Sequence, residues 1–267
     1  MLHLLKRHPV PVTAFFRRSL VLTYAFPGDL LQPLLPPGLL LDGYRGFGFL
    51  AIAMVQTERL RPTFLPAALG RNFFLSGYRI FTRLAGGVSL RGLRILRSDA
   101  DSRWMVAAGN LLTHYHYRLC RASVAEQAGE IEVHIRTPRR EADLDVVARI
   151  GRAPAALPAG SPFASQKDAR RFAGPMPYTF DYEPQTHSIV RILGVHAQWN
   201  PQPVEVEVAQ AAFLQREPFR QAQPVLASAY YLSNLPYRWE RGVRIPLARI
   251  ASTARSSRSA SCGCIRE

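Results

Sequence analysis

Short apolar runs with β-strand character recur along the chain, separated by glycine and proline, and this pattern constrains the fold most. Among 267 residues there are 18 glycines and 21 prolines, which favour strands and turns over long helices. Several runs are apolar at consecutive positions, so both faces of those strands need cover. The sequence predicts a mainly β protein with a few helices, built as a closed or partly closed antiparallel β-barrel with peripheral helices. The expected strands are residues 20–26, 47–57, 73–84, 89–96, 113–124, 131–137, 143–150, 178–182, 188–195 and 204–213.

The pattern predicts one barrel domain over residues 12–247, preceded by an N-terminal arm, residues 1–11, and followed by a disordered tail, residues 248–267. The tail is rich in serine and arginine and poor in bulky apolar residues. Helices are expected at residues 28–35, at 99–112 with Ser98 as the N-cap, and at 165–173, and residues 153–161 are expected to form a loop.

Charge and composition limit the kinds of partner that the protein is expected to bind. The formal net charge is +15, but the arginines are scattered rather than grouped into a basic block. Residues 1–98 carry 13 basic and 3 acidic residues, which favours an anionic small-molecule ligand and leaves nucleic acid as an alternative. No apolar run approaches the length of a bilayer span, so we expect no membrane partner. Cys120 stands alone and Cys262 and Cys264 lie in the tail, which suits a reducing cytoplasm rather than a disulfide scaffold.

Residues 109–120 gather most of the polar and aromatic side chains suited to chemistry. In a strand, His114 and His116 would share one face and could present two metal ligands. We favour ordinary surface histidines, since the sequence places no third ligand beside them. Tyr115 and Tyr117 would share the other face, where they either fill the core or line a pocket.

Other motifs are missing or open to two interpretations. The sequence has no glycine-rich nucleotide loop and no serine-hydrolase elbow, and we expect no cofactor. Arg17, Arg79 and Arg94 lie in apolar strand-like contexts. A charge there must be paired or face a cavity, although a surface position satisfies it equally well.

Four segments together resemble the acetoacetate-decarboxylase-like β-barrel superfamily, and more closely its uncharacterised bacterial branch known only as a domain of unknown function. They are residues 34–39 (Leu-Leu-Pro-Pro-Gly-Leu), 77–81 (Gly-Tyr-Arg-Ile-Phe), 109–118, and 195–199 (Val-His-Ala-Gln-Trp). The resemblance covers residues 12–247 and implies the same barrel fold.

In the decarboxylases a strand lysine forms a Schiff base with a keto acid. The resemblance puts Tyr117 at that lysine and Arg17 at the pocket arginine, and it puts Leu50 and Leu75 at two acidic positions. A phenol cannot form an iminium, so Schiff-base decarboxylation is not expected. If Tyr117 faces the pocket, strand alternation turns His114 and His116 away from it.

We therefore predict a cytoplasmic protein that binds a small carboxylated molecule in an internal pocket through Arg17, Arg79, Tyr115 and Tyr117. An alternative is an enzyme that uses Tyr117 as an acid or base beside the positive charge of Arg118. A second alternative is a basic protein that binds nucleic acid. The sequence is also compatible with a homo-oligomer.

Overall fold

The computed structural model describes residues 2–86, 90–151, 155–174, 176–196, 199–248 and 250. Its strands are β1(Val12–Pro27), β2(Leu39–Leu41), β3(Phe47–Pro62), β4(Arg71–Leu84), β5(Arg91–Ala100), β6(Tyr117–Leu119), β7(Arg121–Gln127), β8(Glu130–Arg136), β9(Leu144–Arg149), β10(Tyr178–Glu183), β11(Ser188–His196), β12(Gln202–Pro203), β13(Glu205–Ala211), β14(Val225–Trp239) and β15(Val243–Pro246). Its helices are α1(Leu2–Leu5), α2(Gly28–Leu31), α3(Arg103–Leu112) and α4(Gln166–Phe172), with short 3-10 turns η1(Gln32–Leu34), η2(Ala67–Leu69), η3(Pro184–Thr186), η4(Ala212–Gln215) and η5(Phe219–Gln221).

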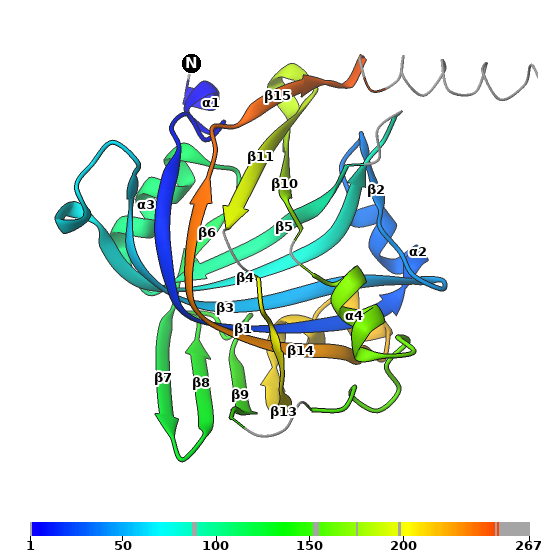
Figure 1. Ribbon diagram of the computed structural model, residues 1–267. Coiled ribbons are helices and arrows are strands. Elements are labelled where there is room, and N and C mark those ends of the chain that lie inside the picture. Colours follow the sequence, from blue (N-terminus) through cyan, green and yellow to red (C-terminus); the bar gives the residue numbers. More distant parts are fainter. Residues whose placement is uncertain are drawn as a thin grey trace, which may run out of the picture.

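Seven strands form a closed ring, which confirms the predicted barrel (Figure 1). The order around it is β14, β1, β3, β4, β5, β10 and β11, and β11 pairs with β14 to complete the circuit. Within this ring every pair is antiparallel except β5 and β10, which run parallel. In the described part of the chain, no helix is long and apolar enough to cross a bilayer.

A second, four-stranded antiparallel sheet covers part of the outside of the ring. Three of its strands, β8, β9 and β13, match strands that the sequence predicts, but the predicted barrel has only helices around it. Its order is β13, β9, β8 and β7, and it extends below the ring in Figure 1. Leu50, Ile52 and Met54 of β3 pack in one buried cluster with Val133 of β8 and Val146 of β9. Because this sheet buries the outer face, strands such as β3 are apolar on both sides.

Two predicted elements have different bounds. The helix expected at 99–112 begins only at Arg103, and its N-cap is Ser102 rather than Ser98, with the Ser102 hydroxyl accepting from Met105 N. Asp99 lies in β5 instead, where Arg97 binds its carboxylate. The strand expected at 113–124 is split: residues 113–116 form an irregular link, followed by β6 and β7.

The long strand β14 lies outside the predicted set, although it pairs with β1 along most of its length. The helix expected at 165–173 is α4, and Ser165 caps it. The helix expected at 28–35 is α2 followed by η1. Most of the predicted tail lies outside the described residues, as do residues 153 and 154 of the predicted loop. The predicted arm packs on the body, because His8 N donates to Leu112 O and Arg7 pairs with Glu183.

Candidate functional site

A cavity of about 270 Å³ lies inside the ring. Alternate side chains of each strand face it, as the two-residue repeat of a strand requires. On β4 these are the odd-numbered positions, while the even-numbered ones enter the outer core. Lining side chains from the strands and α3 include Phe16, Ser19, Val21, Ala51, Ala53, Val55, Thr57, Phe73, Leu75, Arg79, Phe81, Leu93, Ile95, Ser98, Trp104, Met105, Ala108, Thr179, Tyr237 and Trp239, and Tyr115 and Tyr117 join them.

Arg79 places a positive charge in this mainly apolar space. It extends from β4 toward the position where a side chain of Gly77 would lie, since a Cβ on Gly77 would be 3.0 Å from Arg79 Nε. Part of Arg79 is accessible through the cavity. Glycine at position 77 therefore gives the guanidinium the room to lie along the cavity wall.

The Arg79 guanidinium has no acidic partner among the described residues. Its Nε is buried without a hydrogen-bond partner, and no Asp, Glu or Lys belongs to the described lining of the cavity. Burial lowers the pKa of Arg79, and the nearby Tyr237, Tyr117 and Tyr115 oppose that shift. Arginine stays protonated in proteins, so the cavity holds a positive charge that no acidic side chain of the described residues neutralises.

Three phenols surround this charge. The Tyr115 and Tyr117 rings lie 6.2 Å apart between centroids, and Tyr237 stacks on Phe16 at 4.9 Å. Burial raises the pKa of all three tyrosines, although Arg79 opposes the shift in each. They are therefore neutral at physiological pH and can donate hydrogen bonds. The Tyr115 hydroxyl is buried without a geometric partner.

Two more glycines give these phenols their space. A Cβ on Gly109 of α3 would overlap the Tyr117 ring, and a Cβ on Gly194 of β11 would overlap the Tyr237 hydroxyl. Glycines on three separate elements thus adjoin Arg79 and two of the three phenols around it.

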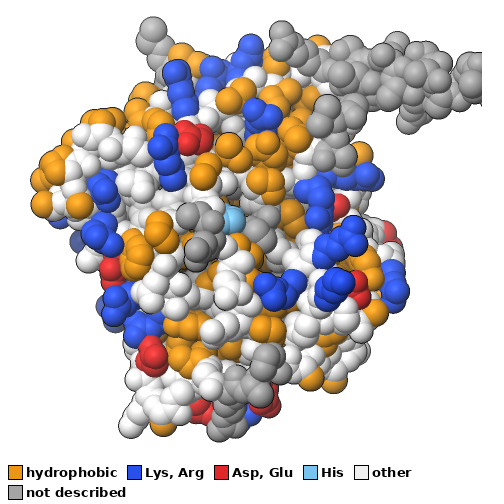
Figure 2. All heavy atoms as spheres, viewed as in Figure 1, with side chains coloured by type: hydrophobic (Ala, Val, Ile, Leu, Met, Phe, Trp, Pro, Cys, Tyr) orange, Lys and Arg blue, Asp and Glu red, His pale blue; other side chains and the backbone are white. Residues whose placement is uncertain are grey.

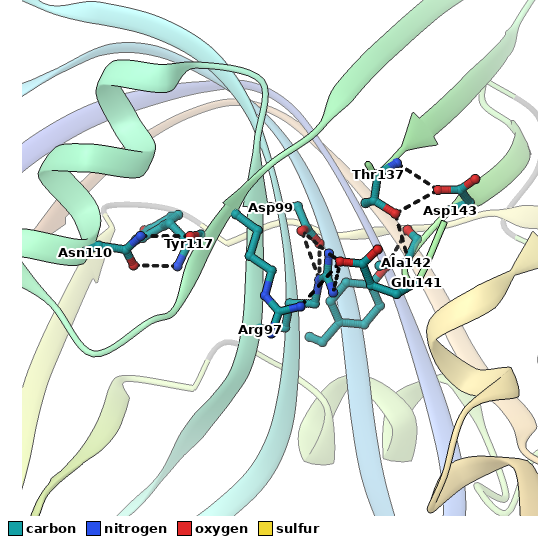
Figure 3. Close-up of polar contacts among 10 residues, drawn as sticks. Arg97, Asp99, Asn110, Tyr117, Thr137, Glu141, Ala142 and Asp143 are labelled. Atoms are coloured by element: carbon teal, nitrogen blue, oxygen red, sulfur yellow. Dashed lines mark hydrogen bonds and ion pairs between the residues drawn. The ribbon is translucent and has the colours of Figure 1, made fainter. Parts of the chain in front are cut away.

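Asn110 fixes the segment that carries Tyr115 and Tyr117 (Figure 3). Its Oδ1 accepts from Tyr117 N and its Nδ2 donates to Tyr117 O, each at 2.8 Å. Thr113 adds a second link, because its hydroxyl donates to Gly109 O at 2.8 Å and accepts from Tyr115 N at 3.2 Å. The amide of Asn110 acts like a neighbouring strand, so two tyrosines face the cavity although only one lies in regular structure.

Three of the four predicted ligand-binding residues come together in the cavity, namely Arg79, Tyr115 and Tyr117. Arg17 does not. It lies in a β-bulge between Phe16 and Arg18, and its side chain is exposed. The bulge shifts the alternation of β1 by one residue, so that Phe16 and Ser19 both face the cavity while Arg17 is outside.

The predicted pairing of Tyr117 with Arg118 is also wrong. The Arg118 side chain is 55% exposed and lies 3.4 Å from Glu141, while Tyr117 faces the cavity. Arg79, not Arg118, is the cation that acts on the Tyr117 phenol.

The histidines lie outside the cavity lining. His114 and His116 lie in the irregular link rather than in a strand, and His116 has a positive φ of 54°. Burial lowers the pKa of both side chains, that of His114 to about 4. In the described part of the chain, no group of three or more His, Cys, Asp or Glu side chains is arranged to hold a metal ion.

A second polar cluster, on the other face of β5, has its charges paired (Figure 3). Arg97 Nε lies 2.9 and 2.8 Å from the two Asp99 oxygens, and Arg97 NH1 lies 3.3 Å from Glu141. Arg94 is likewise paired, with Asp181 at 2.8 Å. Arg94 and Arg97, on the neighbouring strand β5, thus have acidic partners, whereas Arg79 has none among the described residues.

The sequence analysis did not predict Tyr237 as a cavity residue. Its only signal in the sequence is the nearby aromatic residue Trp239.

The DUF2071 family model, described as an uncharacterized conserved protein, matches residues 13–234. The chain belongs to the DUF2071 family. No curated protein sequence matches it. Solved structures of acetoacetate decarboxylase and related enzymes share its fold.

Acetoacetate decarboxylase from Legionella pneumophila subsp. pneumophila str. Philadelphia 1 superposes with a TM-score of 0.60 at 12% identity, over 89% of this chain and 88% of that one. An acetoacetate decarboxylase-like enzyme from Sphingomonas wittichii RW1 gives 0.56 at 15% identity, over 90% and 94%. The enduracididine biosynthesis enzyme MppR complexed with pyruvate gives 0.56 at 12% identity, over 88% and 90%. At these identities the similarity shows the fold alone.

Proposed function

We propose that this DUF2071 protein binds a small organic anion inside its barrel, with the carboxylate of the ligand on Arg79. The observation that carries the proposal is the buried guanidinium without an acidic partner among the described residues. A buried charge is costly unless it is paired and hydrogen-bonded. A ligand carboxylate supplies both the countercharge and hydrogen-bond acceptors for the guanidinium.

The neutral phenols complete the carboxylate site. Tyr115, Tyr117 and Tyr237 are protonated donors beside Arg79, and a carboxylate accepts hydrogen bonds through both oxygens. One structural neighbour, MppR, is described as complexed with pyruvate. Binding of a small carboxylate in a barrel of this fold is therefore consistent with what that neighbour binds.

We propose further that the protein does not form a Schiff base with its ligand. Neither Lys6 nor Lys167 belongs to the described lining of the cavity, and Lys167 is exposed on α4. Tyr117 stands where the resemblance puts the lysine, and a phenol cannot condense with a ketone to give an iminium. The ligand is then held without a covalent bond.

The other two functions gain no support. Arg118 points away from Tyr117, so the acid-base pair lacks its cation. Nucleic-acid binding favours a continuous basic stripe. On the face drawn in Figure 2, arginines and lysines are instead interspersed with apolar and acidic side chains. The cytoplasmic location inferred from the cysteines remains a prediction.

Thermal denaturation with carboxylate probes tests the binding site. Pyruvate, acetoacetate and benzoate are compared with the neutral benzamide, on the wild type, Arg79→Met and the matched surface variant Arg17→Met. A ligand at one hundred times its dissociation constant stabilises by about 2.7 kcal/mol, which is roughly 5–10 °C in a protein of this size.

We expect at least one carboxylate to raise the melting temperature of the wild type and Arg17→Met but not of Arg79→Met. Equal shifts in all three proteins would reject the Arg79 site. Borohydride reduction in the presence of acetoacetate tests the second part of the proposal, because it traps an iminium as a stable adduct. Unmodified Lys6 and Lys167 in the peptide map are the expected result, and an adduct at either would overturn it.

A further inference from the structure

The charges of the cavity favour a ligand with one negative group. Arg61 also lines the cavity, but its Nε donates to Leu65 O and its NH1 to Arg59 O, each at 3.0 Å, which holds its guanidinium against its own loop. His8 is buried and its pKa is lowered to about 4, which leaves it neutral at pH 7. A second carboxylate on the ligand would therefore meet only Arg61, two of whose nitrogens already donate to backbone carbonyls. A ligand ammonium would also lack a partner, because the described lining contains no Asp or Glu.

Away from Arg79 the wall is suited to hydrocarbon. Val55, Phe73, Leu75 and Met105 line it, together with Trp104, which is 49% exposed. Phe81, also in the lining, belongs to a buried aromatic cluster with Phe49. The cavity thus presents the unpaired charge of Arg79 within a mainly apolar lining.

The volume sets the size of that apolar space. A cavity of about 150 Å³ accepts benzene, so one of about 270 Å³ accommodates about eleven non-hydrogen atoms at the same density. Pyruvate would fill only about half of it. An unfilled apolar space forgoes the burial that stabilises a complex by about 0.8 kcal/mol per methylene.

From these three features we infer that the ligand is an amphipathic monocarboxylate with an apolar body of about six to eight carbons, such as a medium-chain fatty acid or an arylalkanoic acid, rather than a short keto acid or a dicarboxylate. This inference rests on the proposed function, because it places the carboxylate on Arg79. It adds the single charge, the apolar body and its length.

Isothermal titration calorimetry with defined probes tests the ligand class. The probes are butanoate, hexanoate and octanoate, the neutral 1-octanol, the dicarboxylate suberate, and pyruvate. Each methylene buried should tighten binding about fourfold, which is 0.8 kcal/mol converted to a ratio. Octanoate should therefore bind about two orders of magnitude more tightly than butanoate, and at least about tenfold more tightly than suberate, whose second carboxylate would enter the apolar part of the cavity.

Arg79→Met separates the carboxylate from the apolar body. It should weaken octanoate at least about tenfold and leave 1-octanol within about threefold, while Arg17→Met changes neither. The chain-length series on the wild type provides a test that does not depend on any variant.

The outcomes distinguish the two proposals. If pyruvate or suberate binds as tightly as octanoate and needs Arg79, the ligand class is overturned and the carboxylate site stands. If affinity rises with chain length but octanoate, like 1-octanol, binds Arg79→Met as tightly as it binds the wild type, the carboxylate site is overturned as well. If neither octanoate nor hexanoate binds, the ligand class is rejected, and the small-carboxylate panel decides the Arg79 site by itself.

Discussion

Arg79→Met should make the unliganded protein more stable, because the substitution removes a buried charge that nothing in the described chain pairs. Methionine has a similar length and fits an apolar wall. Replacing buried ionic groups with apolar ones of similar volume is neutral or stabilising by about 1–4 kcal/mol. With Nε of Arg79 lacking a partner, we expect a gain of about 1–3 kcal/mol, and about 2–4 °C in melting temperature for each kcal/mol.

Arg94→Met is the matched control, since the same change on the neighbouring strand should have the opposite sign. Arg94 NH1 lies 2.8 Å from Asp181 Oδ1, and the two side chains are 13% and 1% exposed. Removing one partner of a buried pair costs about 3–5 kcal/mol because the other charge is left uncompensated.

The cost of Arg94→Met should depend on pH. Burial raises the pKa of Asp181 to about 6 even with Arg94 opposing it, and loss of the arginine raises it further. A raised carboxyl pKa means that the folded state binds more protons than the unfolded one between the two pKa values, so stability falls as pH rises from the unfolded-state pKa of 3.8 to the folded-state pKa and is constant above it. The Arg94→Met penalty should therefore be smaller at pH 4 than at pH 8.

Urea unfolding followed by circular dichroism measures both variants, with m-values compared to verify that the same transition is observed. The reasoning fails if Arg79→Met loses stability to the same extent as Arg94→Met. In that case the guanidinium of Arg79 would be a structural group satisfied within the fold, and no charge would be left for a ligand.

Two further substitutions test the packing of the site and the anchoring of the N-terminal arm. A glycine-to-alanine change ordinarily stabilises a helix by about 0.5–1 kcal/mol, but the Cβ of Gly109→Ala would overlap the Tyr117 ring. We therefore expect its free energy of unfolding in urea to fall by about 1–3 kcal/mol. The same change in a Tyr117→Ala background should raise the free energy of unfolding. Arg7→Met tests the anchoring of the arm. Hydrogen bonds from Arg7 lower the pKa of Glu183 to about 2, so the stability that this ion pair adds is complete above pH 4.5 and is lost as pH falls toward 2. The loss of stability in Arg7→Met relative to the wild type should therefore shrink over that window, and an equal loss at pH 2.5 and pH 7 would contradict the pairing. Arg238→Met is its control at an exposed pair with Glu240 and should cost less than about 1 kcal/mol.

The ring could be predicted from the sequence because its strands are buried on both faces. In β3, Ala51, Ala53 and Val55 face the cavity while Ile52 and Met54 face the second sheet, and the resulting apolar run is visible without a structure. β14 escaped prediction because Asn234, with a positive φ of 53°, and Pro236 interrupt its pattern. Pairing with β1 overrides these local preferences.

The site was only partly predictable, because side-chain direction depends on features that the sequence does not reveal. Period-two alternation fails for Arg17 at a bulge that depends on the pairing of two strands. Alternation happens to hold for Tyr115 and Tyr117, but only Tyr117 lies in a strand ladder, that of β5 and β6, and hydrogen bonds with Asn110 and Thr113 hold the segment in place. Tyr237 joins them from β14, far along the chain, through a ring closure that no local pattern encodes.

The choices that cost stability are concentrated at the cavity. A glycine inside a helix or strand costs about 0.5–1 kcal/mol relative to alanine. Gly77, Gly109 and Gly194 adjoin Arg79, Tyr117 and Tyr237, respectively. Arg79 adds an unpaired charge, although Arg94 shows that this fold can pair a buried arginine on the next strand. Selection for stability alone would remove such features, and a site kept ready for a ligand explains why they occur together. A ligand carboxylate on Arg79 would offset this cost because it pairs the buried charge, so the bound protein should be more stable than the free protein by the amount that the affinity and the ligand concentration set.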